Sequence, residues 1–266
     1  MSRNFGLIVV GDEILSGKRQ DKHLSKVIEL LGERGLALAW ARYVGDSRER
    51  ITATLRDAAA SSDIVFCCGG IGATPDDHTR QAAAAALGQP LALHPEAKQL
   101  IEARMQEVAQ EQGATFEPTR PDNLHRLNMG MFPANASIIP NPFNKIPGFS
   151  VGDLHFVPGF PVMAHPMVAW LLDTRYADLF GTQQQRERSV VVFGAMEASL
   201  TPLMEDIERR FAGHKVFSLP SVDHPQWGKH IELGVKGPAE GLDQAYAALR
   251  QGLLTLDAKL GPEMVR

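Results

Sequence analysis

The stretch DIVFCCGGIGATPDDHT, residues 63–79, decides how the fold of this chain is interpreted. Its first part, residues 64–68, is an apolar run of the kind found in a strand that is buried on both faces. A glycine-rich loop follows and ends in the adjacent carboxylates of Asp76 and Asp77. Loops of this kind often hold phosphate, because their backbone amides can approach an anion closely. Two carboxylates in such a loop therefore need a separate explanation.

Strands and helices alternate on either side of this loop. We expect strands over residues 5–10, 36–44 and 64–68. Each is followed by a helix: the first stops at Gly35, the second starts after Asp46, and the third closes at Gly88. Asp46 is expected to cap the second helix, with Glu49 completing a pattern like a capping box. This order predicts an α/β fold with a mainly parallel sheet covered by helices on both faces.

The remainder of the chain predicts one more long helix, an irregular segment and a second domain. Residues 95–113 have helical spacing, whereas residues 116–149 are interrupted by Pro and Gly and are expected to be irregular. The composition turns polar between Asp173 and Arg188, where we place a domain boundary. The expected domains are residues 1–175, with the α/β fold, and residues 186–266, a small α+β domain with the order β-α-β-β-α.

Composition excludes several classes of protein. The net charge is −4 and no basic run of five or more residues occurs, so nucleic-acid binding is not expected. No run of about 18 apolar residues is present, so no membrane span is expected. The two cysteines, Cys67 and Cys68, are neighbours on a predicted strand and point to opposite faces, which places them poorly for a disulfide. We therefore expect a reducing compartment and a cytoplasmic protein.

The glycine loop contains most of the candidate ligand-binding residues. Gly69, Gly70 and Gly72 leave their amides open to an anion ahead of a helix, although the spacing matches neither the dinucleotide fingerprint nor a Walker loop. Of the two acids, Asp76 or Asp77 can cap the following helix. One acid is enough for that purpose. The other is expected to bind a divalent metal or to accept hydrogen bonds from a sugar or pterin ring.

A second loop offers further candidates at the same edge of the sheet. Residues 11–17, GDEILSG, follow the first strand, and ligands bind beyond the carboxyl ends of parallel strands. The candidates there are Gly11, Asp12, Glu13, Ser16 and Gly17, although a solvated turn is the alternative interpretation. Asp46 follows the second strand and is expected at the same edge.

Three segments together resemble the MoaB/Mog-like molybdopterin-binding domain family. They are GDEILSGKRQD at residues 11–21, VGDSRERI at 44–51 and CGGIGATPDDHT at 68–79, and they are most similar to the amino-terminal part of competence/damage-inducible protein A. The resemblance extends over about residues 5–172, and residues 194–207 resemble the small domain that follows in those proteins. The chain departs from the pattern at His23, where Asn is usual, at Ala73, where Pro is usual, and at Met163, where an acid is usual.

The resemblance implies a three-layer α/β sandwich and specific roles for residues. It implies that Asp46 and Asp77 are catalytic, that Asp76 and Asp77 bind a metal, and that the ligand is bound by the two loops together with Thr74, Thr79, Asn141, Pro158 and Gly159. The implied cofactor is a divalent metal (Mg, Mn or Co), and molybdopterin is a possible ligand. A homo-oligomer, dimer or trimer, is expected. The amidase domain of full-length relatives has no counterpart in this sequence, so deamidation is not expected.

Three functions stay open on these grounds. The first is metal-dependent hydrolysis of a nucleoside-diphosphate sugar such as ADP-ribose. The second is molybdopterin binding or adenylylation, and the third is a binding module without catalysis. All three require a phosphorylated small molecule at the glycine loop.

Overall fold

The computed structural model describes residues 3–182 and 186–266, and the chain divides into two compact units. The first unit is Met1–Thr182 and the second is Gln183–Arg266. Part of the polar segment in which we expected the domain boundary, residues 183–185, lies outside the described residues. Each unit has its own hydrophobic core, and we describe each unit separately.

A six-stranded sheet forms the centre of the first unit, in the order β2-β1-β3-β8-β7-β6. The first four strands in this order are parallel, and β7 and β6 are antiparallel to their neighbours, which confirms a mainly parallel sheet. The strands are β1 (Phe5–Val10), β2 (Leu38–Val44), β3 (Ile64–Cys68), β6 (Ser137–Ile139), β7 (Gly148–Val151) and β8 (Leu154–Val157).

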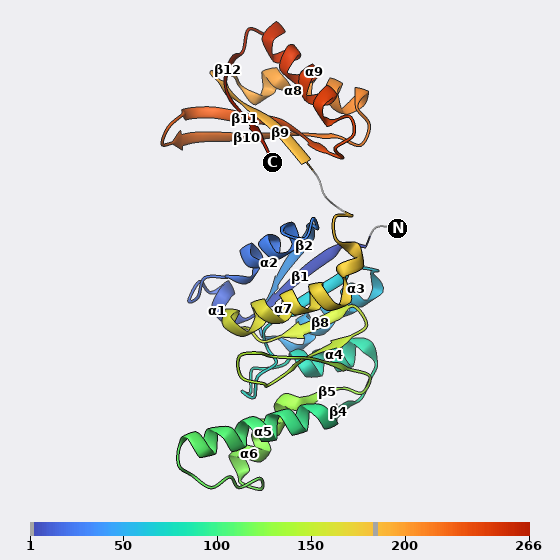
Figure 1. Cartoon of the computed structure of the whole chain (residues 1–266), viewed down its shortest axis with the longest axis vertical. Helices are drawn as coiled ribbons and strands as arrows, with labels where there is room; N and C mark the ends of the chain where they lie inside the picture. The colour runs from blue at the N-terminus through green and yellow to red at the C-terminus, as the bar shows by residue number, and fades with distance from the viewer. Residues whose placement is uncertain (1–2, 183–185) are drawn as a thin grey trace. The chain divides into compact units, whose positions relative to one another are not determined.

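Helices cover both faces of this sheet, so the three-layer sandwich is confirmed (Figure 1). On β1, Phe5, Leu7 and Val9 pack against one pair of helices, while Ile8 and Val10 pack against the other pair. This alternation follows from the period of two in a strand. The first pair is α2 (His23–Gly32) and α7 (Pro161–Arg175), and the second pair is α3 (Arg48–Ala60) and α4 (Thr79–Leu87).

The two cysteines on β3 follow the same rule. Cys67 packs in the core beside α3 and α4, and Cys68 packs in the core beside α2 and α7. Both are free and buried, which confirms the expectation that they do not bridge each other.

The segment expected to be irregular, residues 116–149, contains short elements, so that prediction was wrong. It forms α6 (Pro121–Arg126), the 3-10 turn η1 (Leu127–Gly130), β5 (Met131–Pro133) and strands β6 and β7 of the main sheet. β5 pairs with β4 (Leu91–Leu93), and this pair lies with α5 (Pro95–Glu111) at one end of the unit (Figure 1). These elements are too short to show a periodic pattern among so many prolines.

One loop prediction and two helix-cap predictions were also wrong. The loop after β1 contains a one-turn helix, α1 (Asp12–Leu15). The start of α3 is capped by Ser47, whose Oγ accepts from the amide of Arg50 at 3.3 Å, and not by Asp46. The N-cap of α4 is His78, and no side chain caps that helix. The acids after β2 and β3 are therefore not used as caps.

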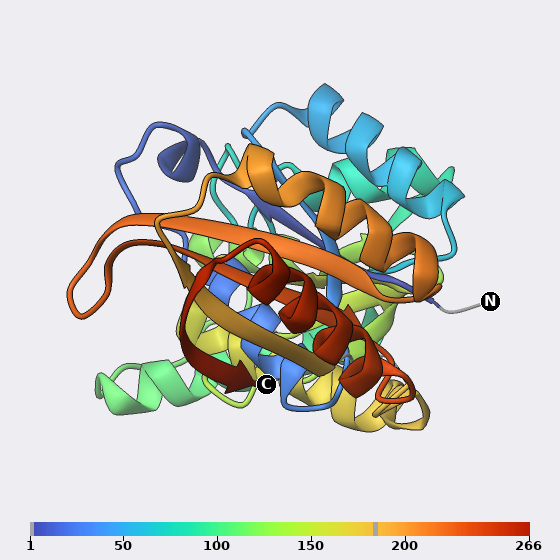
Figure 2. The same ribbon diagram turned by 90° about the horizontal axis from the view of Figure 1, so that it is seen from above.

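The second unit is an antiparallel sheet in the order β10-β11-β9-β12. Its helices, α8 (Glu197–Arg210) and α9 (Leu242–Thr255), lie together across one face of the sheet (Figure 2). The strands are β9 (Arg186–Phe193), β10 (Lys215–His224), β11 (Gly228–Gly237) and β12 (Lys259–Val265). β12 was missed by the sequence pattern, because Gly261 and Pro262 interrupt it where its pairing with β9 shifts register.

No helix in the described part of the chain is long and apolar enough to cross a membrane.

A stack of three phenylalanine rings provides a test of the core. The Phe149 ring lies 4.6 Å from that of Phe132 and 4.4 Å from that of Phe156, and its side chain is fully buried. We expect Phe149→Ala to lower the free energy of unfolding by about 3–5 kcal/mol, because it leaves a cavity between two rings. Phe143→Ala is the control, since Phe143 is 60% exposed and should change stability by no more than about 0.5 kcal/mol. Urea denaturation measures both, and equal effects would contradict this account.

Candidate functional site

A cavity of about 570 Å³ lies at the carboxyl ends of β1, β2, β3 and β8. The loops after these strands meet there, together with residues 141–147. Most of the residues predicted from sequence line it: Gly11, Glu13, Asp46, Gly69, Gly70, Gly72, Thr74, Asp76, Asp77, Asn141, Pro158 and Gly159. Four predicted residues do not line it, namely Asp12, Ser16, Gly17 and Thr79. The glycine loop and the loop after β1 therefore meet at one edge of the sheet.

The glycine loop depends on conformations and contacts that only glycine allows. Gly69 has φ of +109°, and a Cβ atom there would lie 2.3 Å from the carbonyl oxygen of Val10. Gly70 has φ of +69°, and its Cβ would lie 2.2 Å from Oγ1 of Thr79. The Thr79 hydroxyl donates to the carbonyl of Gly69 at 2.9 Å, and the Thr79 amide donates to that of Gly70 at 2.9 Å. Thr79 is thus buried behind the loop, where it holds the loop in place.

Arg80 extends this support. Its side chain is 3% exposed, and its guanidinium donates to the carbonyls of Ile71 and Gly72. A trans peptide directs its C=O and N–H groups in opposite directions. Because the carbonyls of residues 69–72 are held by Thr79 and Arg80, the amides of residues 70–73 turn the other way, and all four of these residues line the cavity. Arg80 was not predicted as a site residue from the sequence, because an Arg in the first turn of a helix usually lies in solvent.

The Arg80 guanidinium is a buried positive charge without a close carboxylate. None of the ion pairs within residues 3–182 and 186–266 includes Arg80. Burial lowers the pKa of Arg80, and the more distant Asp77 partly opposes this change. Arginine still stays protonated in proteins. A positive charge beneath outward-facing amides favours an anion at this wall of the cavity.

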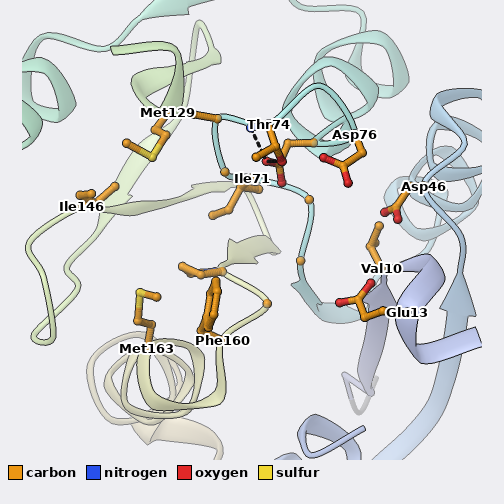
Figure 3. Close-up of a pocket in the computed structure, with 18 of the residues that line it drawn as sticks. Val10, Glu13, Asp46, Ile71, Thr74, Asp76, Met129, Ile146, Phe160 and Met163 are labelled. Carbon is orange, nitrogen blue, oxygen red and sulfur yellow. Dashed lines mark hydrogen bonds between the residues drawn. The ribbon is translucent and has the colours of Figure 1, made fainter. Parts of the chain in front are cut away.

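Asp77 fixes the end of the loop. Its Oδ2 accepts from the amide of Thr74 at 2.8 Å and from the Thr74 hydroxyl at 2.6 Å (Figure 3). The Asp77 amide in turn donates to the carbonyl of Thr74 at 3.1 Å. Of the two adjacent acids, Asp77 therefore stabilises the conformation of the loop through Thr74.

The other acid belongs to a wall of carboxylates. Glu13, Asp46 and Asp76 come from three different loops and lie on one side of the cavity (Figure 3). Asp46 Oδ2 accepts from the amide of Asp12 at 2.9 Å, and Asp12 Oδ1 accepts from the amide of Asp46 at 3.2 Å. This reciprocal pair joins the loops after β1 and β2. Asp12 thus supports the wall from outside the cavity.

Asp46 is the member of this wall whose pKa is raised. Burial raises the pKa of the Asp46 carboxyl above its ordinary value. The amide of Asp12 opposes this change, while the nearby carboxylates of Asp12, Glu13 and Asp76 raise the pKa further. A carboxylate with a raised pKa is a better proton acceptor at neutral pH, which is a frequent property of catalytic bases.

An apolar wall faces the acids. Met129, Ile146, Phe160 and Met163 lie on the other side of the cavity (Figure 3). Of these, only Met163 was singled out in the sequence, as a departure from the family pattern. The others come from short elements and turns, where no periodicity marks them. Such a wall suits a flat ring, whereas the amides of the glycine loop suit its phosphate.

Two predicted residues on the apolar side make hydrogen bonds within the protein. Asn141 accepts from the amide of Phe143 at 3.0 Å, and it donates to Oδ1 of Asn144 and to the carbonyl of Ile146. The carbonyl of Gly159 bonds with His23 Nε2 at 3.0 Å. His23, at a position where the family usually has Asn, thereby positions the loop after β8.

The acids fit a metal ion only in part. Within residues 3–182 and 186–266, no group of three or more His, Cys, Asp or Glu side chains is arranged to hold a metal ion. Magnesium, however, is commonly bound by one or two carboxylates together with substrate phosphates. Asp76 is exposed and Glu13 and Asp46 lie near it, so the wall fits an ion that arrives with a phosphate.

Comparisons with known proteins show which proteins this chain is similar to. The sequence model of a family described as probable molybdopterin binding domain matches residues 6–177. A CinA-like protein of Syntrophotalea carbinolica is 30% identical over 222 residues, 79% of this chain and 52% of that protein. One of Geobacter metallireducens is 29% identical over 267 residues, 97% of this chain and 60% of that protein. The chain therefore spans little more than half the length of these relatives.

A solved structure gives the same result for the fold. The crystal structure of CinA from Thermoplasma acidophilum, a protein of unknown function, superposes with a TM-score of 0.54 at 26% identity. The match covers 65% of this chain and 97% of that one.

The raised pKa of Asp46 predicts a pH-dependent gain in stability on its substitution. Repulsion and burial favour the protonated carboxyl in the folded state, so the wild type loses stability as pH rises through the pKa of Asp46. Asp46→Asn should raise the free energy of unfolding at about pH 7, by at most about 1 kcal/mol because the group is only partly buried. The gain should shrink towards about pH 4. Asp223→Asn, at an exposed acid of the second unit, is the charge-matched control.

Denaturant titrations at both pH values measure this effect. If Asp46→Asn raises the free energy of unfolding no more than Asp223→Asn does, burial and repulsion do not destabilise the Asp46 carboxylate, and this account is contradicted.

The role of Arg80 predicts weaker anion binding on its removal. Arg80→Met should reduce affinity for pyrophosphate by on the order of tenfold or more, because the loop loses charge-assisted bonds and a positive charge. Arg126→Met, in the same unit, changes the net charge equally at an exposed position and should leave affinity within about twofold. Calorimetric titration measures both, and equal affinities for the two variants would refute the role of Arg80.

Proposed function

The chain belongs to the probable molybdopterin binding domain family, and from that premise we propose that its cavity binds a phosphorylated nucleotide and hydrolyses its pyrophosphate bond. The substrate class is a nucleoside-diphosphate sugar, with ADP-ribose as the model compound. The observation that carries this proposal is the presence, in one cavity, of outward-facing amides, a wall of three carboxylates and an apolar wall opposite them. Each wall matches one part of such a substrate.

The phosphates would bind at the loop of residues 69–73. Its amides donate to phosphate oxygens, and buried Arg80 adds a positive charge behind them. The ring would lie against Met129, Ile146 and Met163. In this orientation, the bridging oxygen between the two phosphorus atoms would lie close to the acidic wall.

Asp46 is the proposed base. Its carboxylate takes a proton from water, the water oxygen bonds to one phosphorus, and the bond from that phosphorus to the bridging oxygen breaks. For ADP-ribose the products are AMP and ribose 5-phosphate, and the second phosphate keeps the bridging oxygen. A divalent metal, when bound by Asp76 with Glu13, supplies neutralisation of the phosphate charge. Asp77 keeps the loop in shape through Thr74 and has one carboxylate oxygen left for the metal.

Molybdopterin binding is the second candidate. The family description names this ligand, and the apolar wall suits a pterin ring as well as an adenine ring. The acidic wall favours hydrolysis over simple binding, because the raised pKa of Asp46 suits it as a base for water.

Other parts of the proposal follow from the family resemblance. They are a requirement for Mg, Mn or Co, a homo-oligomer that is a dimer or a trimer, and a cytoplasmic location. The relatives extend beyond the matched region, so activities of their remaining parts are not included.

Hydrolysis can be tested directly. Incubation with ADP-ribose and Mg²⁺, Mn²⁺ or Co²⁺ should release AMP, and Asp46→Asn should lower the rate at least about 100-fold while ADP-ribose still binds. Asp223→Asn should keep the wild-type rate. Chromatography measures AMP, and calorimetry measures binding.

The outcomes separate the candidates. If AMP forms with none of the three metals although ADP-ribose binds, the protein is a binding module. If ADP-ribose does not bind and molybdopterin does, the second candidate replaces the first.

A further inference from the structure

Asn144 has an orientation that is fixed by the backbone. Its Oδ1 accepts from Nδ2 of Asn141 at 2.8 Å and from the amide of Ile146 at 3.0 Å. A backbone amide can only donate, so this atom must be the oxygen and not the nitrogen of the Asn144 amide. The Nδ2 group therefore faces the other way, and Asn144 lines the cavity.

The partner of this NH₂ group is weak. Nδ2 of Asn144 donates to the thioether sulfur of Met163 at 3.4 Å, and no other acceptor for it occurs among the bonds of the described residues. A thioether is a poor acceptor, and an NH₂ group has two hydrogens to donate. Asn144 is only partly buried and lines the cavity, so this NH₂ group is free to donate to a ligand that supplies an acceptor.

The surroundings of this donor are apolar. Met129, Ile146 and Met163 form the wall beside it (Figure 3). Asn141, the other amide on this side, has both its oxygen and its nitrogen engaged within its own loop. Asn144 is thus the side-chain amide on this wall that is still able to contact a ring.

We propose that Asn144 determines ring specificity, by donating from Nδ2 to an acceptor atom at the edge of a heterocyclic base that packs on the wall beside Met163. The proposal rests on the proposed function, which brings a nucleotide into the cavity with its phosphate at the glycine loop. It adds that the base is recognised through a ring nitrogen or a carbonyl oxygen, as in a purine. Binding then depends on the ring and not only on the phosphate.

Two probes that differ only by the base test this proposal. AMP carries adenine, ribose and phosphate, whereas ribose 5-phosphate lacks the adenine. Asn144→Asp keeps an oxygen for the Asn141 side chain and the Ile146 amide, but replaces the donor with an acceptor. Asn135→Asp makes the same change at an exposed position that does not line the cavity.

Calorimetry with Mg²⁺ gives the affinity of each protein for each probe. We expect Asn144→Asp to bind AMP on the order of tenfold more weakly relative to ribose 5-phosphate, because it loses a donor and gains a repulsive contact. Asn135→Asp should keep the wild-type ratio within about twofold, because its added charge is exposed and screened. Thermal unfolding of Asn144→Asp shows whether the loop remains folded.

The results distinguish this proposal from the function on which it rests. An unchanged ratio of the two affinities overturns the role of Asn144. If both affinities fall equally, the new charge acts only on the phosphate, and if neither falls, Asn144 does not contact the ligand. If the wild type binds neither AMP nor ADP-ribose, the proposed function itself fails.

Discussion

The site depends on the direction of four backbone carbonyls. Thr79 and Arg80 hold those of residues 69–72 on the side of α4, and planar peptides then present the next amides to the cavity. Gly69 and Gly70 are required because a side chain at either would meet Val10 or Thr79. The anion site is thus built by hydrogen bonds behind the loop, and the loop needs no lysine of its own.

Charge explains why acids share a cavity with this loop. The amides and Arg80 make one wall positive, while Glu13, Asp46 and Asp76 make an adjoining wall negative. A ligand with phosphates is attracted by the first wall and repelled by the second, and a cation between them reverses that repulsion. The question raised by Asp76 and Asp77 therefore has two answers. Asp77 shapes the loop through Thr74, whereas Asp76 faces the cavity.

The sequence predicted the layers and most of the cavity lining, because buried strands and glycine loops leave local patterns. It did not predict what depends on contacts between distant segments. Asp46 and Ser47 are equally good caps by residue type, but Asp46 accepts from the amide of the distant Asp12, whereas Ser47 caps the helix. Arg80 resembles an exposed helical residue until the loop carbonyls surround it. The weak bonding of the Asn144 NH₂ group depends on its contact with Met163, which lies nineteen positions later in the chain.

The two cysteines of β3 have a practical consequence for experiments on this protein. Burial raises the pKa of Cys67 to about 12 and raises that of Cys68 well above its usual value, so little thiolate forms at neutral pH. Neither sulfur is accessible to maleimides or to peroxide from solvent while the sheet is intact. A fluorophore can therefore be attached at a new surface cysteine of the native protein without first removing the natural pair, and modification of that pair would report the opening of the central sheet.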